Sequence, residues 1–111
     1  MRALLILLAI PFMSVGCVTI GRPFDVSRVP EIRTGKTTEQ DLLRELGGPY
    51  RRGLDDGDAT ATWVHYRLRL LGARDTRDLY VRFSADGTVK SYSFNSNFPE
   101  DREVTERPGS R

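Results

Sequence analysis

Apolar and polar residues alternate in three stretches of the second half of this chain. The first stretch begins at Thr62 and runs to Leu70, the second is Asp78–Ser84, and the third is Thr88–Phe94. A period of two is typical of β-strands that bury one face and expose the other. We therefore expect three antiparallel strands in a meander, with an apolar face that another part of the chain must cover.

The alternation also assigns side chains to the two faces of the expected sheet. The buried face is expected to contain Val64, Tyr66, Leu68, Leu70, Leu79, Val81 and Phe83. The opposite face is expected to carry Trp63, His65, Arg67, Arg69 and Arg82. A tryptophan and three arginines on one face predict a surface for anionic lipid headgroups or for an acidic protein. A solvated face without a partner is the alternative, and His65 is then an exposed strand residue rather than a general base.

The turn between the second and third stretches sets their relative register. A three-residue loop, Ala85-Asp86-Gly87, with Gly87 in the left-handed region places Phe83 and Val89 on the same face. Tyr92 and Phe94 then fall on the opposite face. Either a β-bulge or a second, partly covered face is needed to accommodate these two aromatic side chains.

A short helix is expected before the strands. Thr37 and Gln40 have the spacing of a capping box, and Gly47-Gly48-Pro49 ends the helix. Its apolar side carries Leu42, Leu43 and Leu46. A helix of about nine residues does not persist alone, so it must dock on the sheet. The expected fold is therefore α+β, with short N-terminal helices packed on one face of a three-stranded antiparallel sheet.

The remaining segments give the expected domain organisation. Residues 1–16 are expected to be a signal peptide, and residues 17–30 a tether, because this segment contains glycine and prolines and has no sustained period. The α+β domain is then 31–94. Residues 95–111 are polar and also lack a period, so we expect a disordered C-terminal tail.

The first residues have the features of a secretion signal: Arg2, an apolar run from Ala3 to Met13, and small residues before Cys17. The end of this segment resembles the lipobox of bacterial lipoproteins, which implies that Cys17 receives diacylglycerol and becomes the acylated N-terminus. Small residues before Cys17 also suit an ordinary signal peptidase, which would leave a periplasmic protein with a free thiol. Val18 is not the aspartate that retains such lipoproteins at the inner membrane. The resemblance therefore implies an outer-membrane protein, lipid-anchored on the periplasmic face.

Composition limits the chemistry that this chain can perform. One cysteine and one histidine leave almost no metal site or histidine-based catalytic site. The formal net charge of +2 is too small to indicate a nucleic-acid partner. No nucleophile can be paired with a base. We therefore expect no catalytic residue, no metal, no cofactor and no small-molecule substrate.

Several short motifs occur in an order and spacing that is similar to one known family. They are Ile32–Gln40, Leu46-Gly47-Gly48-Pro49, Trp63–Tyr66, and Leu79–Phe83 followed by Asp86-Gly87. This pattern resembles the SmpA/OmlA family of BamE-like small lipoproteins. The resemblance implies two short helices on a three-stranded antiparallel sheet, at the inner leaflet of the outer membrane, in support of the machinery that inserts β-barrel proteins.

The expected function is accordingly that of a non-enzymatic outer-membrane lipoprotein that supports envelope and β-barrel assembly by binding another protein. The expected fold also resembles the halves of secreted β-lactamase-inhibitor proteins. The alternative is therefore a secreted or tethered inhibitor-like module that binds a periplasmic or extracellular enzyme.

Overall fold

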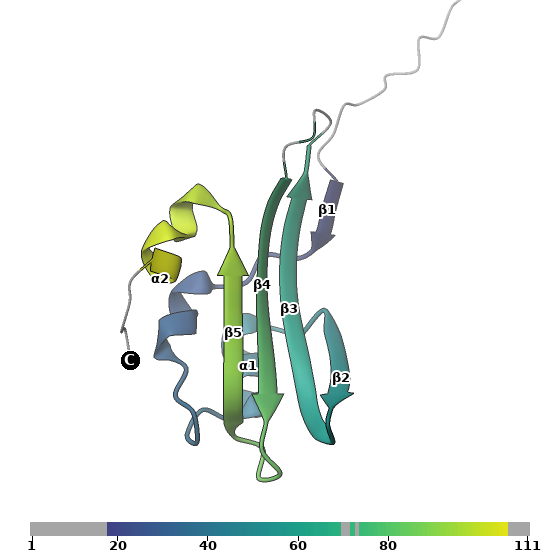
Figure 1. Cartoon of the computed structure of the whole chain (residues 1–111), viewed down its shortest axis with the longest axis vertical. Helices are drawn as coiled ribbons and strands as arrows, with labels where there is room; N and C mark the ends of the chain where they lie inside the picture. The colour runs from purple at the N-terminus through teal and green to yellow at the C-terminus, as the bar shows by residue number, and fades with distance from the viewer. Residues whose placement is uncertain (1–17, 70–71, 73, 107–111) are drawn as a thin grey trace, which may run out of the picture.

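A computed structural model describes residues 18–69, 72 and 74–106 of the chain. The signal peptide and Cys17 lie outside these residues. The elements in chain order are β1 (Val18–Gly21), the 3-10 helix η1 (Val26–Glu31), α1 (Glu39–Leu46), β2 (Arg51–Asp55), β3 (Asp58–Leu68), β4 (Arg74–Phe83), β5 (Val89–Ser96), the 3-10 helix η2 (Pro99–Asp101) and α2 (Arg102–Glu106). The strands form one antiparallel sheet in the order β1-β3-β4-β5, and β2 also pairs with β3 (Figure 1).

The expected three-stranded sheet with N-terminal helices packed on it is wrong, because the sheet has five strands and a short helix also follows it. The two additional strands, β1 and β2, share one edge of β3: β1 pairs with residues 65–68 and β2 with residues 58–62. The sequence of β2, Arg-Arg-Gly-Leu-Asp, has no alternation of apolar and polar residues, and all five residues are exposed. Short edge strands are held by backbone hydrogen bonds to their neighbour, and these leave no hydrophobic period in the sequence.

The connection between β2 and β3 is a tight turn. Asp56 and Gly57 form a two-residue hairpin turn, with φ of 51° and 84°. Positive φ at both central residues is what a tight turn of type I′ requires, and Asp-Gly is a preferred pair there. The Asp-Gly pair is therefore a local hairpin signal that the sequence analysis did not use.

The helix α1 begins one residue later than the sequence analysis predicts. Its N-cap is Thr38, whose hydroxyl accepts from the Asp41 N–H at 3.1 Å while the Asp41 carboxylate accepts from the Thr38 N–H at 3.0 Å. The Thr37 hydroxyl instead accepts from the Arg33 N–H at 2.8 Å. The predicted end is confirmed, because Gly47 is left-handed with φ of 82°.

The turn between β4 and β5 is confirmed. Gly87 has φ of 87°, the Ser84 N–H donates to the Thr88 carbonyl at 2.8 Å, and Phe83 pairs with Val89. A register shift at Arg82/Phe83 places Tyr92 opposite Val81 and Phe94 opposite Leu79. The bulge therefore returns both aromatic side chains to the core face, which was one of the two solutions that the sequence left open.

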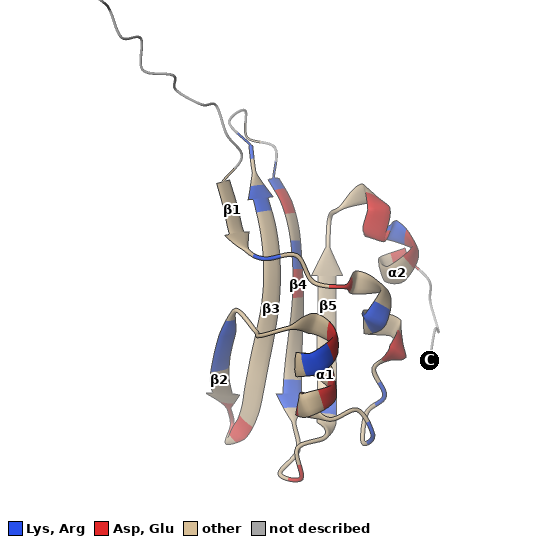
Figure 2. Ribbon diagram, turned by 180° about the vertical axis from the view of Figure 1, so that it is seen from behind, with Lys and Arg blue, Asp and Glu red and all other residues tan. Residues whose placement is uncertain are grey.

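The core lies between this face of the sheet and the segments that cross it, including α1 (Figure 2). Its buried members are Phe24, Val29, Ile32, Leu42, Leu46, Ala61, Trp63, Leu79, Val81, Phe83 and Val89. Phe24 and Val29 belong to the segment that was expected to be a tether. That expectation is wrong for the described residues, because β1 pairs with β3 and η1 buries an apolar side chain.

The expected disordered tail is also ordered as far as the structure describes it. Strand β5 continues to Ser96, and η2 and α2 follow, with Phe98 only 3% exposed. The sequence of this segment is polar because it is held by ion pairs and hydrogen bonds to the sheet, together with one buried aromatic ring. These contacts are between residues far apart in the chain, so local patterning does not predict them.

Candidate protein-binding surface

Trp63 does not lie on a solvent-exposed face. Its side chain is 2% exposed, and its indole Nε1–H donates to the Gly47 carbonyl at the end of α1, at 3.0 Å. Trp63 is paired with Leu79 across the sheet, on the face that α1 covers. The prediction that Trp63 faces water is therefore wrong. Val64 points to the other face yet is 6% exposed, so both faces of β3 are buried at this point and a period of two cannot distinguish them.

The three arginines predicted beside Trp63 are divided between two faces and two regions of the sheet. Arg67 and Arg69 both pair with Asp75, at 2.9 and 3.5 Å, near the end of β3. Arg82 pairs with Asp58 at 2.6 Å on the opposite face, near the start of β3. Trp63 and these arginines therefore do not form one continuous surface. That these arginines contact a lipid or a protein stays a prediction.

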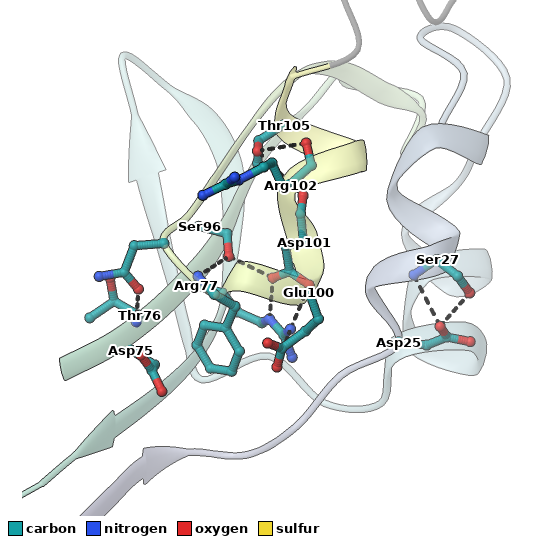
Figure 3. A network of polar contacts seen from close by, with 12 residues as sticks. Asp25, Ser27, Asp75, Thr76, Arg77, Ser96, Glu100, Asp101, Arg102 and Thr105 are labelled. Carbon is teal, nitrogen blue, oxygen red and sulfur yellow. Dashed lines mark hydrogen bonds and ion pairs between the residues drawn. The ribbon is translucent and has the colours of Figure 1, made fainter. Parts of the chain in front are cut away.

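A polar cluster that the sequence analysis missed joins the C-terminal segment to β4 (Figure 3). Arg77 and Asp101 are almost fully buried, and the guanidinium group donates to both carboxylate oxygens, at 2.7 and 2.6 Å. The Ser96 hydroxyl also donates to Asp101, at 2.5 Å. The Phe98 ring lies beneath the Arg77 guanidinium, with the ring centroid 3.8 Å from Cζ. A bidentate pair of this kind, stacked on an aromatic ring, fixes the position of η2 on the sheet.

His65 lies in the same cluster and is 8% exposed, so the expectation of an exposed strand residue is wrong. Its ring centroid is 5.4 Å from that of Phe98. Burial, and then the positive charges of Arg77 and Arg67, lower the pKa of His65 from its ordinary value of 6.5. Within the described part of the chain, Nδ1 of His65 has no hydrogen-bond partner. The surroundings of His65 therefore favour its neutral form in a packed position.

A groove lies on the edge of the sheet between the ends of β1 and α1 and the start of β2. Its volume is about 380 Å³. The residues that line it come from three separate segments: Gly21, Arg22, Phe24, Leu46, Gly48, Pro49, Tyr50, Trp63 and Val64. Neither edge strand pairs with residues 63–64 of β3 at this point. The groove thus opens where the two edge strands leave a gap.

Backbone contacts hold both rims of this groove against β3. On one rim the Arg22 N–H donates to the Val64 carbonyl at 3.2 Å, and on the other the Tyr50 N–H donates to the Thr62 carbonyl at 2.8 Å. Gly21 allows the first contact, because a Cβ on this residue would lie 2.1 Å from the Val64 carbonyl oxygen. The rims therefore have fixed positions, as a preformed binding site requires.

The side chains of the groove combine an apolar floor with an exposed aromatic ring and a cation. Phe24, Leu46 and Trp63 are buried, whereas Tyr50 is 57% exposed and Arg22 is exposed. Among the described residues, Arg22 forms no ion pair within 4.0 Å. Tryptophan, tyrosine and arginine are the residues that most often carry binding energy at protein interfaces. Sequence analysis missed this site. The one sequence feature that could have indicated it is Phe24, a large apolar residue within the segment that was expected to be a tether.

Comparison of the chain with models of known protein families and with curated proteins finds no match. In the part of the chain that the structure describes, no helix has the length and apolar character needed to cross a bilayer. The same residues contain no cluster of three or more His, Cys, Asp or Glu side chains arranged to hold a metal ion.

Proposed function

We propose that this protein is a lipid-anchored outer-membrane protein that works by binding another protein of the cell envelope, in support of β-barrel assembly. The observation that carries the proposal is the groove, with its apolar floor and its exposed Tyr50 and Arg22. The expected signal peptide, residues 1–16, which precedes Cys17, and the motifs similar to SmpA/OmlA lipoproteins support the cellular location. The fold that this resemblance implies is not the one observed, so the groove is the main argument.

The composition of the groove favours binding over catalysis. None of its lining residues is a carboxylate, a histidine, a cysteine, a serine or a threonine. Acid–base and nucleophilic chemistry need such groups within hydrogen-bond reach of a substrate. Arg22 and Tyr50 are instead suited to orient a partner, while the apolar floor accepts one of its side chains.

The same side chains define the chemistry of the partner. An apolar side chain fits above Trp63 and Phe24, and a carboxylate nearby would complement the positive charge of Arg22. We therefore propose that the groove receives an acidic, partly apolar segment of a subunit of the barrel-assembly machinery.

Site-specific photo-cross-linking tests this proposal in intact cells. A photoreactive residue in place of Tyr50, in the groove, is expected to cross-link to a barrel-assembly subunit that mass spectrometry identifies. The matched control is the same residue in place of Ser93, which is exposed on the face of the sheet opposite the core. Cross-linking of that subunit from Tyr50 alone supports the proposal.

Two outcomes would overturn it. Equal cross-linking from positions 50 and 93 would remove the groove from the argument. Capture of an envelope enzyme in place of an assembly subunit, with inhibition of that enzyme by the purified protein, would establish the inhibitor-like alternative instead.

A further inference from the structure

Strand β2 has an open outer edge in the described part of the chain. It pairs with β3 on one side, and no described element lies along its other side (Figures 1 and 2). The Asp56-Gly57 turn makes Asp55 and Asp58 a hydrogen-bonded pair, and such pairs alternate along an antiparallel ladder. The N–H and C=O groups of Leu54 and Arg52 therefore point away from β3. Among the described residues these groups form no other backbone hydrogen bond.

The side chains of β2 offer an apolar group and two charges at this edge. Leu54 is 78% exposed. Within the part of the chain that the structure describes, Arg51 forms no ion pair within 4.0 Å. Oδ2 of Asp55 accepts from the Tyr80 hydroxyl at 2.6 Å and lies 3.8 Å from Arg82, whereas Oδ1 has no described partner. A basic and an acidic group near opposite ends of one short strand can therefore bind outside this chain.

The sequence of β2 is complementary to itself in the antiparallel direction. When a second copy pairs about Gly53, Arg51 lies opposite Asp55 of the partner subunit, and by symmetry each ion pair occurs twice. Arg51 and Asp55 are four residues apart, so their side chains lie on the same face of the sheet. Opposite charges that face each other across two strands stabilise the pairing. The same register joins the outward backbone groups of Arg52 to those of Leu54 of the partner subunit.

The charges also select this register over the neighbouring ones that join the outward backbone groups. A shift in one direction places Arg52 opposite Arg52 of the partner subunit, and like charges directly opposite each other destabilise a strand pair. A shift in the other direction places Asp55 opposite Gly53 of the partner subunit, and Arg51 opposite Gly57 of the partner subunit. Neither Arg51 nor Asp55 then gains an ion pair, so the register about Gly53 is favoured.

We propose that β2 is a self-association surface, through which two copies of this protein join their sheets in an antiparallel pair about Gly53. A glycine at the two-fold position leaves both backbones clear, which suits the Cα–Cα separation of about 4.5 Å in a non-hydrogen-bonded pair. Five residues from each copy form a small interface, so the dimer is a weak one. The contact uses residues 51–55 and none of the residues that line the groove, so it is independent of the proposed function.

Disulfide trapping in intact cells, under a mild added oxidant, tests this contact. Gly53→Cys places two thiols across the two-fold position, at a separation that a disulfide spans. The matched control is Leu54→Cys, because this highly exposed neighbour points to the other face and would cross-link readily in random collisions. The wild type gives the background from Cys17, and mass spectrometry of the linked peptides identifies the 53–53 pair. The trapped dimer is expected to be several-fold more abundant in Gly53→Cys than in Leu54→Cys.

An exchange of charges gives a second test of the register. In the Gly53→Cys protein, Arg51→Asp is expected to reduce the trapped dimer several-fold, because it places like charges opposite each other. Addition of Asp55→Arg restores opposite charges and is expected to recover the dimer. Sedimentation equilibrium of purified proteins that keep Gly53 makes the same comparison without a cysteine in β2.

Four outcomes would overturn the inference. They are equal trapping of Gly53→Cys and Leu54→Cys, a trapped dimer that Arg51→Asp does not reduce, a wild type that sediments as a monomer at every concentration, and trapping of Gly53→Cys to a different protein. The last outcome would assign the β2 edge to that protein.

Discussion

Arg77 and Asp101 form a buried bidentate ion pair, although they belong to β4 and η2 and are 24 residues apart in sequence. Two hydrogen bonds, at 2.7 and 2.6 Å, join the guanidinium and carboxylate groups. The Phe98 ring packs against both the Arg77 guanidinium and the ring of His65, the cross-strand neighbour of Arg77. The C-terminal segment therefore covers one end of the core face instead of extending into solvent.

Replacing Asp101 by Ala is expected to lower the free energy of unfolding by about 3–5 kcal/mol, because the Arg77 charge would be left buried and unpaired. Urea unfolding followed by circular dichroism measures this change. The matched control is Glu106→Ala, which removes an ion pair with Arg102 whose side chains are 72% and 67% exposed. That control is expected to cost less than about 1 kcal/mol. Equal effects of the two substitutions would contradict the assignment.

Replacing Leu42 by Ala is expected to lower the free energy of unfolding by about 2–5 kcal/mol, since Leu42 is 1% exposed within the core. Leu54, in β2, is 78% exposed and provides the control. Leu54→Ala is expected to change stability by no more than about 0.5 kcal/mol. Thermal melting of both variants checks the prediction, and a greater loss in Leu54→Ala would show that α1 is not docked as described.

The fluorescence of Trp63 reports directly on the face of β3 that it occupies. The chain contains one tryptophan, so its emission has a single source. A buried indole is expected to emit at shorter wavelength than in the urea-unfolded chain and to resist quenching by acrylamide. Native emission at the same wavelength as the unfolded chain would place Trp63 in water, as the sequence analysis predicted.

Stability is expected to fall between about pH 7.5 and pH 5.5 because of His65, the chain's one histidine. Burial and the two arginines lower its pKa in the folded state, so the unfolded chain binds the proton more readily. The contribution of neutral His65 is therefore fully present above the ordinary pKa of 6.5 and is lost as the pH falls toward the folded-state pKa. Each tenfold difference in proton affinity corresponds to about 1.4 kcal/mol.

Urea unfolding at both pH values, in the wild type and in His65→Gln, isolates this contribution. The wild type is expected to lose stability at the lower pH, and the variant is expected to lose less. The same pH dependence in both proteins would assign the effect to other groups.

The sequence analysis located the elements with strong local signals and assigned some of them correctly. The end of α1 at Gly47 and the loop that ends at Gly87 follow from backbone conformations that favour glycine. Leu42, Leu46, Leu79, Val81 and Phe83 are buried as expected. Each of these features depends on neighbouring residues in the chain, so a local pattern is sufficient to find it.

The errors have a common physical cause. Strands β1 and β2 exist because β3 offers an edge with backbone donors and acceptors, which no residue within β1 or β2 encodes. The orientation of Trp63 depends on which face of β3 is covered by α1. The groove needs three distant segments, so composition could not reveal it.

Local sequence therefore determined the helix, the turns and the central strands, because capping, glycine conformation and apolar periodicity act over a few residues. Tertiary structure decided the edge strands, the face that holds Trp63 and the burial of Arg77 against Asp101. These features arise from contacts between residues that are far apart in the chain, where burial and charge pairing set the free energy and neither is visible in a short window of sequence.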